Sequence, residues 1–243
     1  QQVKKYQGQY LYGDVIESAQ TILKKILSHP RVIRGSLAGS LRRKMEIGRN
    51  INLVVSTHRP QEVLTAFSKF PEVEAVRFEG KESGHYSLFS GLEVDLRASS
   101  DQTFPYSLFC FTGSLTHWNS IFEKAKAMGL NLSEKALHQN GKAILCKEEE
   151  GIYYALGLDY IHPELRENQG EIEVSEIHQL PRLIENQDIQ GIFHVHSSYS
   201  DGTNSIRRLA HASKEMGFSY LGLSDHSQSA RYAGGLSRET LQK

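Results

Sequence analysis

The chain has 243 residues, 39% of them apolar, so it can bury a substantial core and form one or two domains. Its formal charge is zero, which argues against a uniformly basic nucleic-acid-binding protein. No apolar run approaches the roughly 20 residues of a membrane span. The N-terminal stretch lacks the apolar core of a signal peptide, so we expect a cytoplasmic protein.

In chain order, apolar spacing predicts alternating helices and strands over the first hundred residues. Helices are expected at 12–28 and 61–70. Strands are expected at 32–37, 51–55, 73–78 and 85–89, and from Gly91 onward. This order predicts an α+β fold with a mixed or antiparallel sheet and helices on one side of it.

From Thr112 the pattern becomes helical, and a hairpin over 131–146 and a short helix over 148–156 follow. Residues 161–190 contain two prolines and show little periodicity, so we predict an acidic linker there. A new unit is expected over 191–243. The two cysteines match neither a disulfide framework nor a Cys-x-x-Cys metal site, and we expect free, buried thiols at Cys110 and Cys146.

Charge is distributed unevenly along this order. Residues 1–60 carry eleven Lys or Arg against three acidic residues, a net charge of +8. Residues 147–190 carry three against eleven, a net charge of −8. Lys24 and Lys25 fit an ordinary solvated helix face, but a basic surface around the Gly39-Ser40 turn would attract phosphates.

The stretch from Gly39 to Val55, GSLRRKMEIGRNINLVV, has the layout of a nucleotidyltransferase active site. Phosphoryl transfer with two divalent cations depends on carboxylate ligands, and residues i and i+2 of a strand point to one face. An Asp-x-Asp pair would therefore hold the cations, but here the pair is Asn50 and Asn52. The later strand GLEVDLR supplies Asp95 as the candidate third carboxylate. One carboxylate and two amides form a much weaker dication site than three carboxylates.

In their order and spacing, these motifs resemble those of the bacterial family X DNA polymerases, relatives of DNA polymerase beta that carry a C-terminal PHP phosphoesterase domain. Further shared motifs are FTGS at 111–114, GLNLSEKAL, PELRENQGEIE, and HVHSSYSDGTNS with SDHS. The resemblance implies a nucleotidyltransferase palm over 1–98 and a thumb over 99–160. After the linker over 161–190 we expect a truncated N-terminal part of the PHP domain over 191–243, the first βαβ part of a PHP-type barrel.

The resemblance also implies roles for residues of the palm and thumb. Gly39, Ser40 and Arg43 would hold the triphosphate of a deoxynucleoside triphosphate, as backbone amides and a guanidinium fork match phosphate oxygens. The turn containing Phe111 and Gly113 would line the sugar and base of the nucleotide. The palm of the family uses Mg²⁺ or Mn²⁺, and the two asparagines are expected to weaken the binding of either ion here.

Four positions depart from the family pattern. Arg49 replaces a small residue, usually glycine, and Asn50 and Asn52 replace catalytic aspartates. Trp118 stands where an asparagine normally contacts the incoming nucleotide. Because an engineered inactivation would change only the aspartates, we favour natural decay of the site.

A second set of candidate metal ligands lies near the C-terminal end. His194 and His196 are two apart on a predicted strand, Asp201 follows in a turn, and His226 ends the next strand. Their placement at strand ends of one βαβ unit favours metal ligation. The resemblance assigns all four to a cluster that cleaves phosphoesters, with Zn²⁺ or Mn²⁺ in the intact domain. Because a PHP barrel needs later ligands, we expect an incomplete set that binds metal poorly.

These observations predict a fragment of a family X polymerase-like DNA-repair protein whose partner is DNA and whose polymerisation is lost or strongly reduced. One alternative is a slow polymerase in which Asn50 and Asn52 coordinate metal through neutral oxygens. Another is a non-catalytic DNA-docking platform for the PHP nuclease. The docking hypothesis predicts salt-dependent DNA affinity through basic residues such as Arg42 and Arg43.

Overall fold

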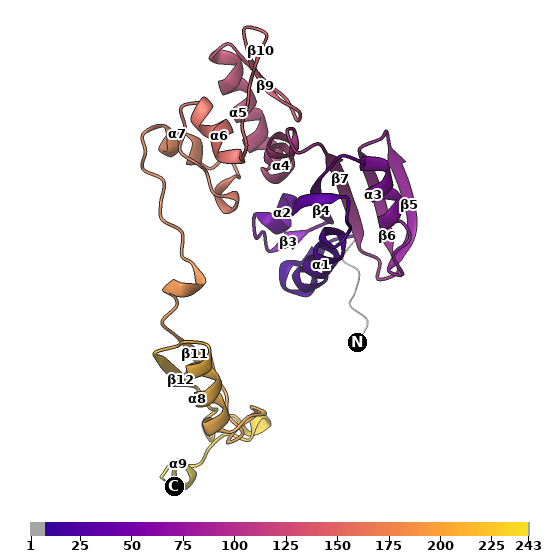
Figure 1. Ribbon diagram of the computed structural model, residues 1–243. Helices are drawn as coiled ribbons and strands as arrows, with labels where there is room; N and C mark the ends of the chain where they lie inside the picture. The colour runs from indigo at the N-terminus through magenta and orange to yellow at the C-terminus, as the bar shows by residue number, and fades with distance from the viewer. Residues whose placement is uncertain (1–7, 243) are drawn as a thin grey trace. The chain divides into compact units, whose positions relative to one another are not determined.

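A computed structural model describes residues 8–242, and the chain divides into two compact units, Gln1–Leu180 and Pro181–Lys243 (Figure 1). Lys4 and Lys5 of the basic segment lie outside the described residues. Within the described part, no helix combines the length and apolar character needed to cross a membrane. The predicted free cysteines are confirmed, with Cys110 partly buried and Cys146 buried.

The first unit contains a five-stranded sheet with the strand order β2-β4-β7-β6-β5 (Figure 1). β4 and β7 pair in parallel, and the other neighbouring strands pair antiparallel. Of the two predicted alternatives for the α+β fold, a mixed or an antiparallel sheet, the structure therefore has the mixed sheet. The strands are β2 (Val32–Ala38), β4 (Asn50–Thr57), β5 (Val73–Glu79), β6 (Ser83–Leu88) and β7 (Glu93–Ser99).

One face of this sheet carries the main core. Ile51, Leu53 and Val55 of β4 point to it and are fully buried, because alternate residues of a strand share a face. Two helices cover this face with their apolar sides, α1 (Tyr12–Leu27) and α3 (Pro60–Phe67). Each fully buried aliphatic side chain stabilises the fold by roughly 1.5–3 kcal/mol.

The opposite face of β4 carries Asn50, Asn52 and Val54. Helix α4 (Phe104–Thr112) packs on this face, with Leu108 in one cluster with Val54. The expectation that helices lie on one side is therefore wrong for α4, and the sequence pattern missed this helix. Its residues, FPYSLFCFT, are apolar on nearly every side, so no amphipathic period marks it.

The rest of the first unit encloses a second core beside α4. The predicted helix after Thr112 is α5 (Leu115–Ala127), and the Ser114 hydroxyl caps it by accepting from the backbone N–H of His117. The predicted hairpin is a three-stranded antiparallel sheet. Its strands and the helix that follows are β8 (Leu130–Leu132), β9 (Leu137–Gln139), β10 (Lys142–Ile144) and α6 (Glu149–Ala155).

The structure corrects the acidic linker expected over 161–190. The part up to Leu180 belongs to the first unit and contains η1 (Pro163–Leu165) and α7 (Glu171–Glu176). Arg166 is fully buried, and Ile172 joins the second core. Arg166 and Glu171 of this stretch make buried ion pairs, which the sequence does not distinguish from solvated charges.

The second unit is a parallel strand pair joined by a helix, the predicted βαβ arrangement. β11 (Gly191–Val195) pairs with β12 (Tyr220–Leu223), and α8 (Ile206–Glu215) lies between them in the chain. The Ser205 hydroxyl caps α8 by accepting from a backbone N–H. Three short helical elements complete this unit, η2 (Asn186–Asp188), η3 (Arg231–Ala233) and α9 (Arg238–Leu241).

Candidate functional site

The parallel pairing of β4 and β7 brings the three predicted palm residues together. Asn52 lies directly opposite Asp95, and Asn50 is two residues away on the same face. The Asn50 side-chain amide donates a hydrogen bond of 2.8 Å to Asp95 Oδ2. The Asn52 amide donates to the backbone carbonyl of Asn50 over 3.1 Å.

A histidine that sequence reasoning left without a role completes this group. His85 of β6 lies opposite Asp95 in the antiparallel register, and its Nδ1 contacts Asp95 Oδ1. Its Nε2 lies 3.2 Å from a carboxylate oxygen of Glu79. Burial lowers the pKa of His85, but the two carboxylates outweigh it and raise the pKa above 6.5. Predicting this contact from the sequence would have required the correct register between β6 and β7.

These residues do not fit a pair of divalent cations. Asp95 is the one carboxylate of the group, and Asn50 and His85 engage both of its oxygens. The amides of Asn50 and Asn52 are turned so that their N–H groups, rather than their oxygens, make the internal contacts. Mg²⁺ and Mn²⁺ need several oxygen ligands, and charged ones offset the cost of removing their water.

The Gly-Ser turn lies directly against the asparagine pair. Gly39 has a φ of +58°, and a Cβ there would come within 2.6 Å of Asn52 Nδ2, so only glycine fits. It starts α2 (Gly39–Arg42), with Ser40 as the second residue. Tyr10 closes one side by donating from its hydroxyl to the backbone carbonyl of Asn50 over 2.7 Å.

Most of the residues predicted to bind nucleotide line one open cleft. Its volume is about 410 Å³, and it lies where the Gly-Ser turn faces the start of α5. The predicted residues among its lining are Gly39, Ser40, Arg43, Asn50, Asn52 and Gly113. Arg49, Ser114 and Leu115 also line it.

Phe111 and Trp118 do not line this cleft. Phe111 borders a separate hollow of about 80 Å³ beside His85 and Asp95, and the Arg97 guanidinium lies 3.7 Å above its ring. Trp118 packs into the second core, with ring centroids 6.0 Å from Phe109. Trp118 is therefore partly buried against the second core, and its contact with a nucleotide stays a prediction.

Ion pairs join the basic segment to the acidic stretch. Arg34 pairs with Glu148 at 2.6 Å, and Lys44 pairs with Glu164 at 2.8 Å. Arg42 and Arg43 pair with Glu149 and Glu167, and both donate to Thr112 over 2.7 Å. Four basic residues of the first segment are therefore paired with four acidic residues of the second. The phosphate-attracting surface expected from residues 1–60 is correspondingly reduced.

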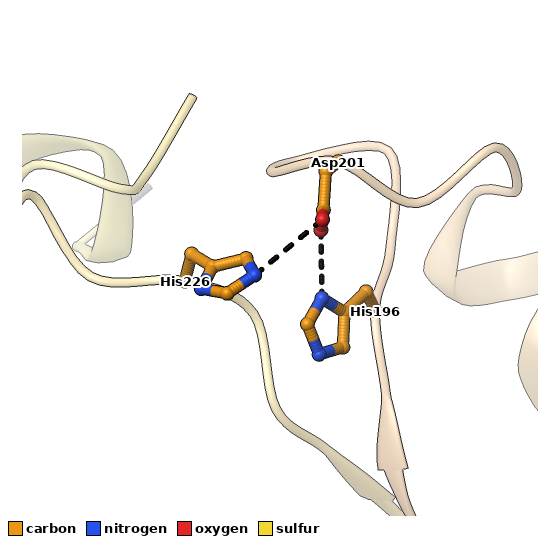
Figure 2. A group of neighbouring side chains, drawn as sticks. All are labelled: His196, Asp201 and His226. Carbon is orange, nitrogen blue, oxygen red and sulfur yellow. Dashed lines mark hydrogen bonds and ion pairs between the residues drawn. The ribbon is translucent and has the colours of Figure 1, made fainter. Parts of the chain in front are cut away.

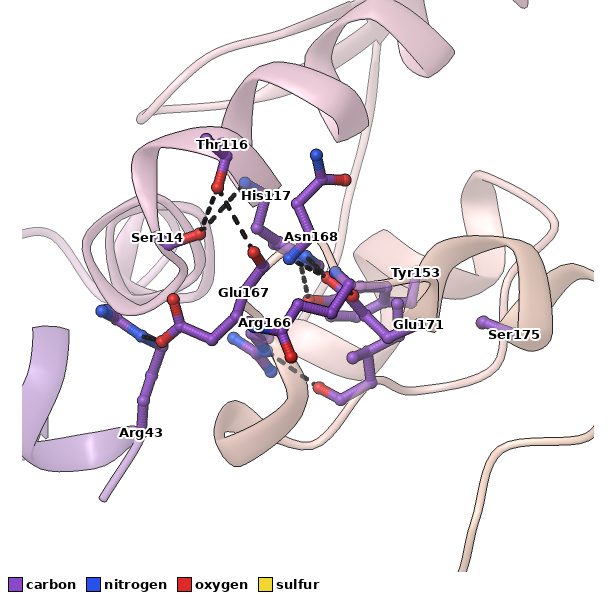
Figure 3. Close-up of polar contacts among 12 residues, drawn as sticks. Arg43, Ser114, Thr116, His117, Tyr153, Arg166, Glu167, Asn168, Glu171 and Ser175 are labelled. Carbon is purple, nitrogen blue, oxygen red and sulfur yellow. Dashed lines mark hydrogen bonds and ion pairs between the residues drawn. The ribbon is translucent and has the colours of Figure 1, made fainter. Parts of the chain in front are cut away.

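Arg43 illustrates this neutralisation (Figure 3). Its side chain is 12% exposed, and it reaches from the end of α2 to Glu167. The Arg42 side chain is 18% exposed and is held in the same way. Neither guanidinium is free to act as the exposed DNA contact that the docking hypothesis requires.

A buried pair anchors the acidic stretch from inside. Arg166 Nη1 donates to Glu149 Oε1 over 2.7 Å, and Arg166 Nε donates to the carbonyl of Ile161 over 2.8 Å. The guanidinium also lies 5.1 Å from the ring centroid of Tyr153 and 5.3 Å from that of Tyr160. Burial raises the pKa of Glu149, but Arg166 and Arg42 outweigh it, so the net shift is downward.

His117 forms a second buried network close by (Figure 3). Its Nδ1 donates to Glu171 Oε1 over 2.6 Å, and its Nε2 accepts from the Tyr153 hydroxyl over 3.1 Å. Glu171 also accepts from the backbone N–H groups of Asn168 and Gln169. Burial lowers the pKa of His117 below 6.5, and the Glu171 carboxylate opposes this only in part.

This network predicts a pH dependence of stability. Unfolded His117 takes up a proton near pH 6.5 but folded His117 does not, so its stabilisation is complete above that pH and declines below it. Between about pH 7.5 and 5.5 the free energy of unfolding should fall more steeply in the natural chain than in His117→Gln. Urea denaturation followed by tryptophan fluorescence measures both slopes. Equal slopes would show that His117 does not contribute.

In the second unit, three of the four predicted metal ligands converge (Figure 2). Asp201 lies between two imidazoles, 2.7 Å from His196 Nδ1 and 3.4 Å from His226 Nε2. One ligand atom from each residue falls within 4.8 Å of the others, which suits a single divalent cation. His194 stacks on His196 at 5.3 Å but is not in this group.

The position of His194 has a backbone cause. Its φ is +60°, and the pairing of β11 with β12 shifts register between Ile192 and Val195. The regular strand alternation that would put His194 and His196 on one face is interrupted there. Asp225 supports the site differently, by accepting from the backbone N–H and the hydroxyl of Ser197, both over 2.7 Å.

Comparisons with known proteins agree with this arrangement. A family model described as the DNA polymerase beta thumb matches residues 107–167, and a PHP domain model matches residues 193–234. The DNA polymerase/3'-5' exonuclease PolX of Bacillus subtilis (strain 168) is 33% identical over 235 residues. The match covers 95% of this chain and 41% of that protein, so the chain spans about two fifths of its length.

Proposed function

We propose that the chain forms the DNA- and nucleotide-holding part of a DNA-repair protein. The proposal rests on the family of the chain, because it belongs to the family X DNA polymerases that carry a PHP domain. We assign the palm to residues 1–98 and the thumb to the part of the first unit that follows. We further propose that this palm does not catalyse two-metal nucleotidyl transfer. The cytoplasmic location expected from the sequence stays a prediction.

The state of Asp95 carries this proposal. In two-metal phosphoryl transfer, carboxylates hold the cations that neutralise charge on the attacking and leaving oxygens. Here the one carboxylate is engaged by Asn50 at Oδ2 and by His85 at Oδ1. The partners that would share a cation with it are the neutral amides of Asn50 and Asn52. Without the cations, the attacking and leaving oxygens have no metal ion to bind them during the transfer.

Primer extension tests the proposed inactivity. The natural chain, given a primed template, deoxynucleoside triphosphates and either Mg²⁺ or Mn²⁺, should extend the primer no faster than Asp95→Ala. Glu93→Ala is the matched control, because Glu93 is an exposed carboxylate on the same strand whose hydrogen bond is to Ser87. Extension that Asp95→Ala abolishes and Glu93→Ala retains would instead support the slow-polymerase alternative.

We propose a metal-binding role for the second unit. His196, Asp201 and His226 fit a shared Zn²⁺ or Mn²⁺ in ligand type and spacing. Such an ion would supply Lewis acidity and an activated water for phosphoester cleavage. Asp225 would hold the loop from Ser197 to Ser200 in place, since the Ser200 hydroxyl donates to it over 2.6 Å.

A further inference from the structure

Arg49 takes part in none of the hydrogen bonds that join Asn50, Asn52, His85 and Asp95. Its side chain is exposed and lines the cleft between the Gly-Ser turn and the start of α5. Among the described residues it makes no hydrogen bond or ion pair, whereas Arg42 and Arg43 are held by Glu149 and Glu167. It is thus a cationic side chain in the cleft whose charge no neighbouring group matches.

Among the residues that the structure describes, the lining of the cleft contains no carboxylate. Its charged side chains are Arg43 and Arg49, and Glu167 neutralises the first of these. A cleft lined by carboxylates repels a polyphosphate unless a dication lies between the two. Asn50 and Asn52 remove that repulsion, and Arg49 adds a positive charge beside them. The exposed guanidinium of Arg49 therefore favours binding of an anion in the cleft, although the Asp95 carboxylate lies behind Asn50.

Hydrogen-bond donors are available beside Arg49. The amides of Asn50 and Asn52 each carry two N–H bonds, and the internal contacts use one of each. Ser40 also lines the cleft, with its side chain hydrogen-bonded to Tyr10. A guanidinium with amide and hydroxyl donors around it matches the oxygens of a phosphate chain in both charge and geometry.

We propose that this cleft binds the polyphosphate of a nucleotide directly, without a divalent cation, with Arg49 supplying the charge that metal ions would otherwise supply. The inference rests on the proposed nucleotide-holding role of the palm and adds the mode of binding. Asn50 and Asn52 act in it as hydrogen-bond donors to phosphate rather than as weakened metal ligands. The three departures from the family pattern at Arg49, Asn50 and Asn52 would then serve the same function, binding phosphate without a metal ion.

Isothermal titration calorimetry with dATP and with inorganic tripolyphosphate, each in EDTA and in Mg²⁺, tests the proposal. Both probes should bind the natural chain in EDTA, and Mg²⁺ should change the affinity by less than about threefold. Arg49→Gln should weaken binding of both probes by about tenfold or more, since a charge-assisted contact to phosphate is lost. The affinity of Arg49→Lys should lie between those of the natural chain and Arg49→Gln, because lysine keeps the positive charge but lacks the forked guanidinium.

Arg59→Gln is the matched control, because Arg59 is exposed, lies at the start of α3 and does not line the cleft. Its affinities should equal those of the natural chain. Binding only with Mg²⁺, equal binding of Arg49→Gln and the natural chain, or equal weakening by Arg59→Gln would each overturn the inference. Primer extension reads out the proposed inactivity separately, so a chain that neither extends primers nor binds dATP in EDTA contradicts this inference alone.

Discussion

Replacing Arg166 by alanine should lower the free energy of unfolding by about 3–5 kcal/mol, because it leaves a buried carboxylate without its main partner. The Arg166 side chain is 0% exposed and that of Glu149 is 4% exposed, so water cannot take over the lost contacts. The change also leaves a cavity beside the rings of Tyr153 and Tyr160. Urea denaturation followed by the fluorescence of Trp118, which packs in the same core, measures the loss.

A surface ion pair provides the control for this prediction. Lys126 and Glu123 lie 3.8 Å apart with side chains 70% and 67% exposed. Lys126→Ala should change the free energy of unfolding by less than about 0.5 kcal/mol, since exposed pairs contribute little. A loss of similar small size for Arg166→Ala would mean that the acidic stretch is not anchored by Arg166.

Arg166 also shows why the prediction of a linker over residues 161–190 was wrong for the part up to Leu180. Residues 161–190 have two prolines, many acids and no apolar period, all of which are typical of a linker. The stretch up to Leu180 folds onto the first unit because individual charges find buried partners, such as Arg166 with Glu149 and Glu171 with His117. Pairing between residues far apart in sequence leaves no local pattern to detect.

The palm group was largely predictable because it depends on strand alternation. Asn50, Asn52 and Asp95 could be placed together from two strands whose apolar and polar residues alternate. His85 could not, because its contact with Asp95 depends on how β6 pairs with β7. The inward turn of Trp118 was hidden for a similar reason. Trp118 packs against Phe109 of α4, a helix whose mostly apolar sequence has no helical period that would mark it.

Restoring both aspartates, in the variant Asn50→Asp/Asn52→Asp, should raise the affinity for Mn²⁺ by about a hundredfold or more, since affinity for such ions rises with the number of charged ligands. Three carboxylates would then face one another across β4 and β7, and a dication relieves their repulsion. Adding His85→Ala should raise the affinity further, because it frees Asp95 Oδ1. Calorimetric titration with Mn²⁺ measures each step.

A variant with the same change in charge elsewhere is needed for comparison. Asn119→Asp/Asn131→Asp adds two carboxylates at exposed positions of α5 and β8. Its affinity for Mn²⁺ should match that of the natural chain. An equal gain in both double variants would mean that Mn²⁺ responds to overall charge and not to the palm geometry.

The most direct test of the central claim is an electron paramagnetic resonance titration of the chain with Mn²⁺. The change His196→Ala/His226→Ala removes the second unit's ligands, so that any ion bound tightly belongs to the palm. We predict no palm-bound Mn²⁺ at concentrations up to about 1 mM, because one engaged carboxylate and two amides hold such ions weakly. Two tightly bound ions that disappear on Asp95→Ala would contradict the account.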